Sequence, residues 1–149
     1  MNDVTERGGG TVLVVDDAEM NRDVLARRLE RHGYTVLTAE SGERALEIVA
    51  AQPVDLILLD VMMPGMNGLE VLAKLSEGST PTTLPVIMAT AKDASEDVVQ
   101  ALQSGANDYV TKPLDFHVVL ARCRTQLNLK RAQEALAERV AEIQRLLGD

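Results

Sequence analysis

The sequence alternates short runs of β-branched and other apolar residues with amphipathic helical patterns, and this alternation constrains the fold more than any other feature. Five such runs predict β-strands, at residues 11–15, 35–39, 56–59, 85–90 and 108–111. Helical patterns follow them at residues 20–29, 41–51 and 69–75, in the segment that ends at Ser104, and in the segment that begins near Asp115. Right-handed crossovers place each helix over one face of a parallel sheet or the other. The sequence therefore predicts an α/β fold in which an open, doubly wound, five-stranded parallel sheet carries helices on both faces.

The composition fits one aliphatic core rather than two domains. Of 149 residues only Tyr34, Tyr109 and Phe116 are aromatic, so Val, Leu, Ile, Ala and Met must fill a core of the kind that surrounds a buried parallel sheet. The net charge of −8 repels nucleic-acid phosphates, and no aromatic residues are interleaved with basic ones, so we expect no direct nucleic-acid binding. Cys123 is the only cysteine, which excludes an internal disulfide and a multi-cysteine zinc site.

Neither a signal peptide nor a membrane span is expected. Residues 1–10 lack an apolar core segment and end in three glycines, so we interpret them as a flexible N-terminal segment. No apolar run is long enough to cross a bilayer. These features predict a cytoplasmic protein with no membrane partner.

Local signals mark two of the helix starts. Asn67 is followed by Glu70, and Asp93 by Glu96. Each pair has the spacing at which two side chains cap unpaired N–H groups reciprocally. Both pairs predict helices that begin at these positions.

The last segment of the chain has a different pattern. Leu129, Ala132, Leu136, Val140, Ile143 and Leu147 recur at steps of three or four along a charged stretch without Gly or Pro before the last turn. This spacing predicts an amphipathic helix. Its apolar stripe either folds back on the domain or serves a helical dimer or linker. We expect the domain to span residues 11–126 and this helical linker or dimerisation extension to span residues 127–149.

Acidic residues stand where two of the predicted strands end. Asp16 and Asp17 follow the first strand, and Asp60 follows the third. In the common order of five-stranded doubly wound sheets these strands are neighbours, and ligands collect at their carboxyl ends. Three crowded carboxylates repel one another unless a cation is present, and hard oxygen ligands favour Mg²⁺ or a similar ion. A divalent metal site is the prediction.

Two further side chains belong to the same edge of the sheet. Lys112 follows the fifth strand and precedes Pro113, a candidate for a cis-proline turn, while Thr90 ends the fourth strand. A carboxylate nucleophile, a metal, a lysine and a hydroxyl suit phosphoryl transfer. Taken singly, Asp16 or Asp17 could equally well be a residue that only forms a turn or caps a helix. The ordered set of five residues favours the phosphoryl-transfer site.

Four segments that carry these residues resemble the motifs of response-regulator receiver domains. They are Val-Val-Asp-Asp at 14–17, Leu-Leu-Asp-Val-Met-Met-Pro-Gly-Met-Asn-Gly at 58–68, Ala-Thr-Ala at 89–91 and Tyr-Val-Thr-Lys-Pro at 109–113. The resemblance covers about residues 11–126. It implies a flavodoxin-like (βα)5 sheet of strand order 2-1-3-4-5.

The resemblance also implies a role for each site residue. Asp60 is expected to be the phosphoacceptor. The ligands of Mg²⁺, or of Mn²⁺, are expected to be Asp16, Asp17, the Asp60 carboxylate and the backbone carbonyl of Met62. The phosphoryl group is expected to meet Lys112, Thr90 and the neighbouring Ala91, with Tyr109 changing rotamer in response. Met62 and Lys92 are the positions that tune the lifetime of the aspartyl phosphate in this family.

These roles imply a phosphorylation-dependent switch rather than an enzyme, although one that assists its own phosphorylation and dephosphorylation. Its donor is expected to be a sensor histidine kinase or phosphotransfer protein, so neither His32 nor His117 need take part. We expect a homodimer through the C-terminal helix and the face formed by the fourth helix, fifth strand and fifth helix. The output module, whether nucleotide cyclase, diguanylate cyclase, kinase or another class, stays open.

Two other functions use a similar sheet with different residues at its edge. An aspartyl-phosphate-type phosphohydrolase places its nucleophile after the first strand and a second Asp two positions later, whereas here Asp16 and Asp17 are adjacent and Ala18 and Glu19 follow. A flavin-binding module needs N–H donors for a phosphate where this chain has carboxylates. The hydrolase is the alternative that we keep.

Overall fold

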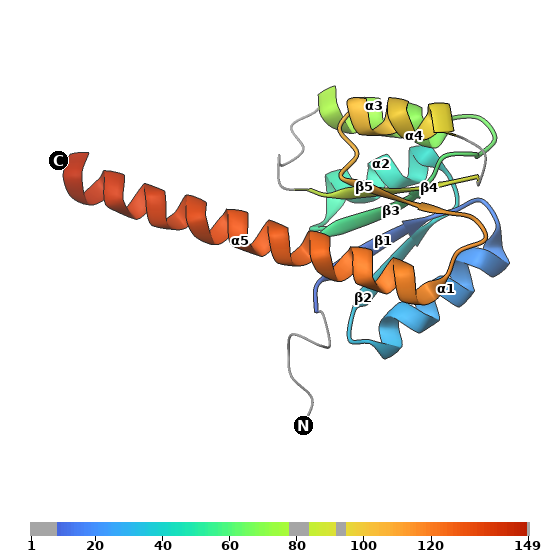
Figure 1. The fold of residues 1–149 in the computed structure, drawn as a ribbon, viewed down its shortest axis with the longest axis horizontal. Helices are drawn as coiled ribbons and strands as arrows, with labels where there is room; N and C mark the ends of the chain where they lie inside the picture. The colour runs from blue at the N-terminus through green and yellow to red at the C-terminus, as the bar shows by residue number, and fades with distance from the viewer. Residues whose placement is uncertain (1–8, 78–83, 92–94, 149) are drawn as a thin grey trace.

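The predicted alternation of strands and helices is present in the computed structural model, which describes residues 9–77, 84–91 and 95–148 (Figure 1). The strands are β1 (Thr11–Val15), β2 (Thr35–Ala39), β3 (Leu56–Asp60), β4 (Val86–Thr90) and β5 (Asp108–Thr111). The helices are α1 (Glu19–Arg31), α2 (Gly42–Ala51), α3 (Gly68–Glu77), α4 (Ser95–Gln103) and α5 (Phe116–Gly148). All four strand pairs are parallel, in the order β2-β1-β3-β4-β5. Fold class and strand order are therefore confirmed.

Side-chain alternation along the strands builds two apolar layers. Leu13 and Val15 of β1 face α2, α3 and α4, while Val12 and Val14 face α1 and α5. Figure 1 shows these two groups of helices on opposite sides of the sheet. Strands β3 and β4 are buried along their whole length, as expected for a parallel sheet covered on both faces. The aliphatic core predicted from the composition is the one observed.

Local signals set several helix ends. Asn67 and Glu70 form the predicted reciprocal cap: the Asn67 N–H donates to Glu70 Oε1 at 3.1 Å, and the Glu70 N–H donates to Asn67 Oδ1 at 2.9 Å. Helix α1 ends before Gly33, whose φ of 92° is a conformation that glycine adopts without strain. The second predicted cap involves Asp93, which lies outside the described residues.

Helix α5 runs without interruption through the boundary expected at residue 126. Its first turns are buried on the domain as far as Leu127, and beyond that point it projects away from the sheet (Figure 1). Leu136 is 65% exposed and Ile143 is 52% exposed, so the apolar stripe does not fold back on its own domain. Among the described residues, no helix is long and apolar enough to cross a membrane.

A cluster of ion pairs holds α5 against the domain at the point where the helix leaves it. Lys130 Nζ lies 3.4 Å from Asp55 Oδ1 and 2.7 Å from Glu134 Oε2, and Asp55 Oδ2 accepts a 2.8 Å hydrogen bond from the Thr11 N–H. Burial lowers the pKa of Lys130, but the hydrogen bond to Glu134 and the charges of Asp55 and Glu134 outweigh it, and the pKa lies above its usual value. The direction in which α5 leaves the domain is therefore held by charged contacts.

We expect Cys123 to be unreactive in the folded protein. It is fully buried on α5 against the sheet, and burial raises the pKa of its thiol to about 12, so almost no thiolate forms at neutral pH. Thiol titration with a disulfide reagent should show no reaction in buffer and one reactive thiol in denaturant. Rapid titration of the native protein would contradict this placement.

Candidate functional site

Three carboxylates meet at the carboxyl edge of the sheet. Strands β1 and β3 are direct neighbours, so Asp16 and Asp17 after β1 come beside Asp60 at the end of β3. One oxygen from each carboxylate lies within 4.8 Å of the others. Asp60 is only 3% exposed and Asp16 8%, whereas Asp17 faces solvent. The sequence-predicted cluster is thus assembled by strand order, not by proximity along the chain.

Asp60 is held from two sides. Its Oδ1 accepts hydrogen bonds from Lys112 Nζ at 2.8 Å and from the Met62 N–H at 3.2 Å, while Oδ2 has no protein donor in the described part of the chain. Burial raises the pKa of Asp60, Lys112 lowers it, and the nearby Asp16 adds to the increase; the pKa lies above its usual value. The site is therefore electrostatically short of positive charge.

Asp16 has a structural role as well as a place in the cluster. Its Oδ1 accepts a 2.8 Å hydrogen bond from the Ala18 N–H, and Arg22 Nη1 donates to the Asp16 carbonyl at 2.8 Å. Its own N–H donates to the Ala39 carbonyl at 3.2 Å. The turn-former interpretation is correct for Asp16, and these contacts fix the carboxylate beside Asp60.

Lys112 lies directly after β5, and the end of this strand positions it at the site. Its N–H donates to the Thr90 carbonyl at 2.8 Å, which continues the ladder between β4 and β5. The Lys112–Pro113 peptide bond is cis, as the sequence suggested. The Lys112 side chain is one-third exposed, and its Nζ lies 2.8 Å from Asp60 Oδ1.

The remaining predicted residues surround this centre in different ways. Thr90 is 1% exposed, and its Oγ1 has no hydrogen-bond partner among the described residues. Tyr109 is half-buried against the layer formed by α2, α3 and α4. Met62 is 67% exposed and Ala91 is exposed, whereas Lys92 lies outside the described residues.

Neither histidine joins the site. The His32 ring lies 5.3 Å from the Phe116 ring, and His32 Nδ1 is 3.0 Å from the Arg28 carbonyl oxygen. His117 is exposed in the first turn of α5. The metal-competent group found in the described residues consists of aspartates alone.

Gly68 supports the site but was not singled out from the sequence. A Cβ at this position would collide with the Asp60 carbonyl and lie 2.8 Å from Val61 Cα. The Gly68 N–H also donates to the Val61 carbonyl at 2.9 Å. The start of α3 therefore packs directly against the end of β3. The sequence sign of this close contact is the glycine that directly follows the Asn67 cap.

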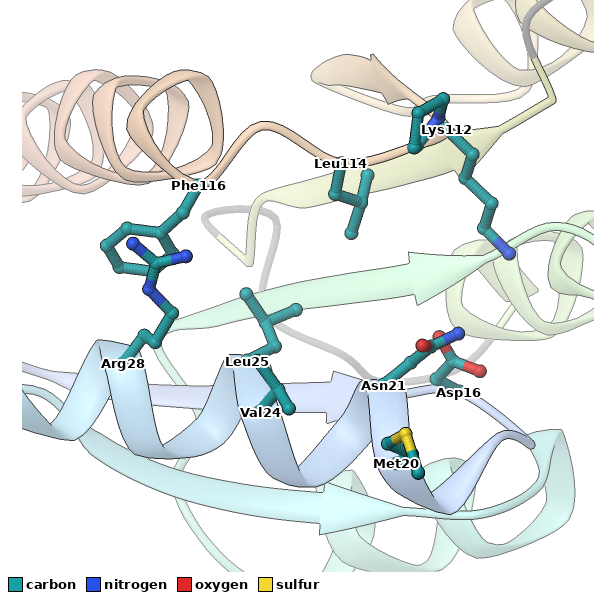
Figure 2. A pocket seen from close by; sticks show the side chains of 10 residues that line it. Asp16, Met20, Asn21, Val24, Leu25, Arg28, Lys112, Leu114 and Phe116 are labelled. Atoms are coloured by element: carbon teal, nitrogen blue, oxygen red, sulfur yellow. The ribbon is translucent and has the colours of Figure 1, made fainter.

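A groove of about 420 Å³ opens beside the aspartates, between α1 and the segment from β5 to α5. Figure 2 shows Asp16 and Lys112 at one end of it and Arg28 with Phe116 at the other. The Arg28 guanidinium carbon lies 4.3 Å from the centre of the Phe116 ring. Two apolar side chains on its α1 side are exposed, Met20 at 78% and Val24 at 52%. The sequence offered no sign of this groove, because its walls come from segments far apart in the chain.

Comparison with known proteins agrees with this geometry. The family model described as the response regulator receiver domain matches residues 12–124. The response regulator PleD of Caulobacter vibrioides (strain NA1000 / CB15N) is 42% identical over 135 residues, covering 91% of this chain and 30% of PleD. The phosphate regulon transcriptional regulatory protein PhoB of Pseudomonas aeruginosa is 39% identical over 119 residues, covering 80% of this chain and 52% of PhoB. The chain thus spans roughly a third to a half of the length of these relatives.

Solved structures show the same fold. A CheY-like response regulator receiver domain protein from Methanospirillum hungatei JF-1 superposes with a TM-score of 0.78 at 27% identity, covering 83% of this chain and 98% of that one. A putative response regulator from Chloroflexus aurantiacus J-10-fl gives a TM-score of 0.77 at 31% identity, covering 80% and 98%. Family model, relatives and fold agree, and the chain belongs to the response-regulator receiver family of two-component signalling systems.

Proposed function

We propose that the chain is a phosphorylation-dependent switch in which Asp60 accepts a phosphoryl group from a phosphohistidine of a sensor kinase or phosphotransfer protein. The observation that carries this proposal is the buried Asp60 carboxylate, which shares its edge of the sheet with Asp16, Asp17 and Lys112. A carboxylate in such a place serves as a nucleophile when the charge around it is neutralised.

The donor set fits a divalent metal. Asp16, Asp17 and Asp60 supply hard oxygen ligands, with the Met62 carbonyl as the fourth protein ligand in the proposal, and Mg²⁺ or Mn²⁺ accepts such ligands. The raised pKa of Asp60 also fits a metal site. Burial disfavours the charged carboxylate of Asp60, and a bound cation would offset that cost. When bound, the metal neutralises the charge of the phosphoryl oxygens and of the carboxylates.

The chain's own residues then account for the transfer. The free oxygen of Asp60 attacks phosphorus, the phosphorus–nitrogen bond to the donor imidazole breaks, and the nitrogen leaves with the electron pair. Lys112, already on the other oxygen, stabilises negative charge on the phosphoryl group. Attack by water on the same phosphorus breaks its bond to the Asp60 oxygen, releases inorganic phosphate and restores the carboxylate; this is the dephosphorylation that the domain would assist.

Thr90 and Tyr109 provide the readout in this proposal. The Thr90 hydroxyl is buried without a partner in the described residues, and a phosphoryl oxygen on Asp60 would satisfy it. Movement of Thr90 then favours another rotamer of the half-buried Tyr109 on the neighbouring strand β5. Met62 and Lys92 are proposed to tune how long the acyl phosphate survives.

The groove beside Asp16 offers the donor protein an approach. It leads to the edge where Asp60 lies, and its exposed Met20 and Val24 supply apolar contact area. A protein helix presenting a phosphohistidine is therefore a better match for this surface than a free small phosphodonor.

The switch is proposed to act through a homodimer and a further module. The dimer would use the α4-β5-α5 face and the distal part of α5, whose apolar stripe is exposed. The adjacent positions of Asp16 and Asp17 favour the switch over the phosphohydrolase alternative.

Incubation with acetyl phosphate and Mg²⁺ tests the proposal. Intact-mass analysis should show one added phosphoryl group that hydroxylamine or acid removes, and none when the metal is chelated. Asp60→Asn should abolish the addition, while Asp23→Asn, an exposed carboxylate on α1, should label like the wild type. Unchanged labelling of the Asp60 variant would refute the assignment.

A further inference from the structure

The exposed apolar side chains of α5 beyond Leu127 follow a stricter pattern than amphipathicity requires. We define the distal seam as Leu129, Gln133, Leu136, Val140, Ile143 and Leu147. Successive members are separated by alternating steps of four and three residues, so each pair of steps spans seven residues, the heptad repeat of a left-handed coiled coil. Its apolar members are between 44% and 80% exposed. Gln133 is its one polar member.

We propose that a second copy of this chain covers the distal seam as a parallel, in-register two-stranded coiled coil, with the two Gln133 amides paired across the axis. The inference deepens the proposed homodimer and rests on it, but it does not rest on the chemistry of Asp60. It specifies the orientation of the two chains and the residue that sets their register.

The attachment of α5 turns the distal seam away from its own domain. The helix face that meets the domain carries Lys130 and Glu134, joined to each other at 2.7 Å, with Lys130 also 3.4 Å from Asp55. At 3.6 residues per turn, this face lies about 120° around the helix from the distal seam. The seam cannot reach the domain surface without breaking these ion pairs. A second helix can approach the seam without displacing these ion pairs.

The polar position distinguishes the two possible orientations. In a parallel, in-register pair each seam residue faces its own copy, so each Gln133 amide can donate to and accept from the other. An antiparallel pair that overlaps the whole seam places Gln133 opposite Ile143 of the second copy. That arrangement buries an amide against an apolar side chain without a partner. The seam therefore favours the parallel pair.

Repulsion between like charges along the seam's borders also disfavours the antiparallel pair. In the parallel pair Arg139 lies beside Gln144 of the second copy, and Ala132 lies beside Ala137. The antiparallel overlap brings Arg139 beside Arg139 of the second copy, and like charges at this spacing repel. Lys130, the other cation near the seam, is already held by Glu134 and Asp55.

The coil begins where the domain ends. Gln126, one repeat before Gln133, is only 8% exposed against its own domain, so the seam starts at Leu129. From Leu129 to Leu147 a helix is about 28 Å long, fewer than three heptads. We therefore expect a concentration-dependent equilibrium between monomer and dimer rather than a permanent dimer.

Sedimentation of the 149-residue chain tests whether a second copy covers the seam. We expect dimers at micromolar to submillimolar concentration, and a dissociation constant raised about 100-fold or more by Leu136→Glu. Ala135→Glu adds the same charge on an exposed position outside the seam and should keep the wild-type constant. A monomer throughout this range, or equal effects of the two variants, would overturn the inference.

Cysteine cross-linking tests the orientation. Gln133→Cys should give an interchain disulfide with itself under mild oxidation, and the buried native Cys123 should not interfere. Cross-linking only in mixtures of Gln133→Cys with Ile143→Cys would show antiparallel chains and overturn the inference. If Asp60 is not labelled but position 133 cross-links to itself, the proposed phosphorylation is wrong and the coiled coil stands. If Asp60 is labelled but no dimer forms, the coiled coil is wrong and the proposed phosphorylation stands.

Discussion

Replacing Asp60 with Asn is expected to raise the melting temperature of the metal-free protein at neutral pH, in addition to the expected loss of phosphorylation. The Asp60 side chain is 3% exposed, and its pKa is raised by burial, against the opposing effect of Lys112. Below the ordinary carboxyl pKa of about 4, Asp60 is neutral in both the folded and the unfolded protein. As pH rises, the unfolded chain ionises more readily than the folded one, because the folded pKa is higher. The folded protein therefore loses stability as pH rises through the folded pKa of Asp60. Asn keeps the shape without the charge. Lys112, one-third exposed, can be solvated by water instead.

Thermal unfolding in a chelator between about pH 4 and pH 7 measures this effect. The difference between Asp60→Asn and wild type should be largest near pH 7 and shrink towards pH 4. Asp23→Asn, with its exposed carboxylate, should show no such difference. An Asp60 variant less stable than wild type in chelator at pH 7 would show that the Lys112 ion pair outweighs burial.

Mg²⁺ should reverse the order of stability. A ligand that binds only the folded state stabilises it by about 1.4 kcal/mol for each tenfold increase in concentration above the dissociation constant. Wild type should follow this slope, while Asp60→Asn, which lacks one of the three carboxylates proposed to bind the metal, should begin to respond only at higher Mg²⁺. Identical responses of the two proteins would place the metal elsewhere.

Replacing Gly68 with Ala is expected to lower the free energy of unfolding by about 1–3 kcal/mol and to slow the labelling of Asp60. The added methyl collides with the Asp60 carbonyl and approaches Val61 Cα to 2.8 Å. Both are backbone atoms of a buried central segment, so they cannot move aside as a flexible side chain would. Relief requires α3 to shift or the end of β3 to bend, and either change displaces Asp60, the proposed phosphoacceptor.

Urea unfolding and the initial rate of acetyl-phosphate labelling check this prediction. Gly148→Ala is the matched control, because it makes the same change near the end of α5, where an added Cβ meets nothing within 4 Å. The control should keep wild-type labelling and lose no stability. A Gly68→Ala protein within about 0.5 kcal/mol of wild type would mean that the contact relaxes freely.

Sequence periodicity was sufficient for the architecture and for the centre of the site. Strands such as β3 are continuous apolar runs, and the alternation with helices leaves few topologies when crossovers are right-handed. Asp16 and Asp60 are separated by 44 positions in sequence, yet both follow strand ends, so the shared edge could be inferred without coordinates. The Asn67 cap was equally predictable, because its partner is three residues away.

Features that depend on contacts between distant segments were decided only by the tertiary structure. The raised pKa of Asp60 depends on how deeply β3 is buried, and the close approach of Gly68 depends on the packing of α3 against it. The groove needs α1 and the start of α5 side by side. The sequence also left open whether the apolar stripe of α5 folds back on its own domain. In the structure the ion pairs of Lys130 with Asp55 and Glu134 set the direction of the helix. Periodicity reports which face of an element is apolar, but only the packed fold decides what that face meets.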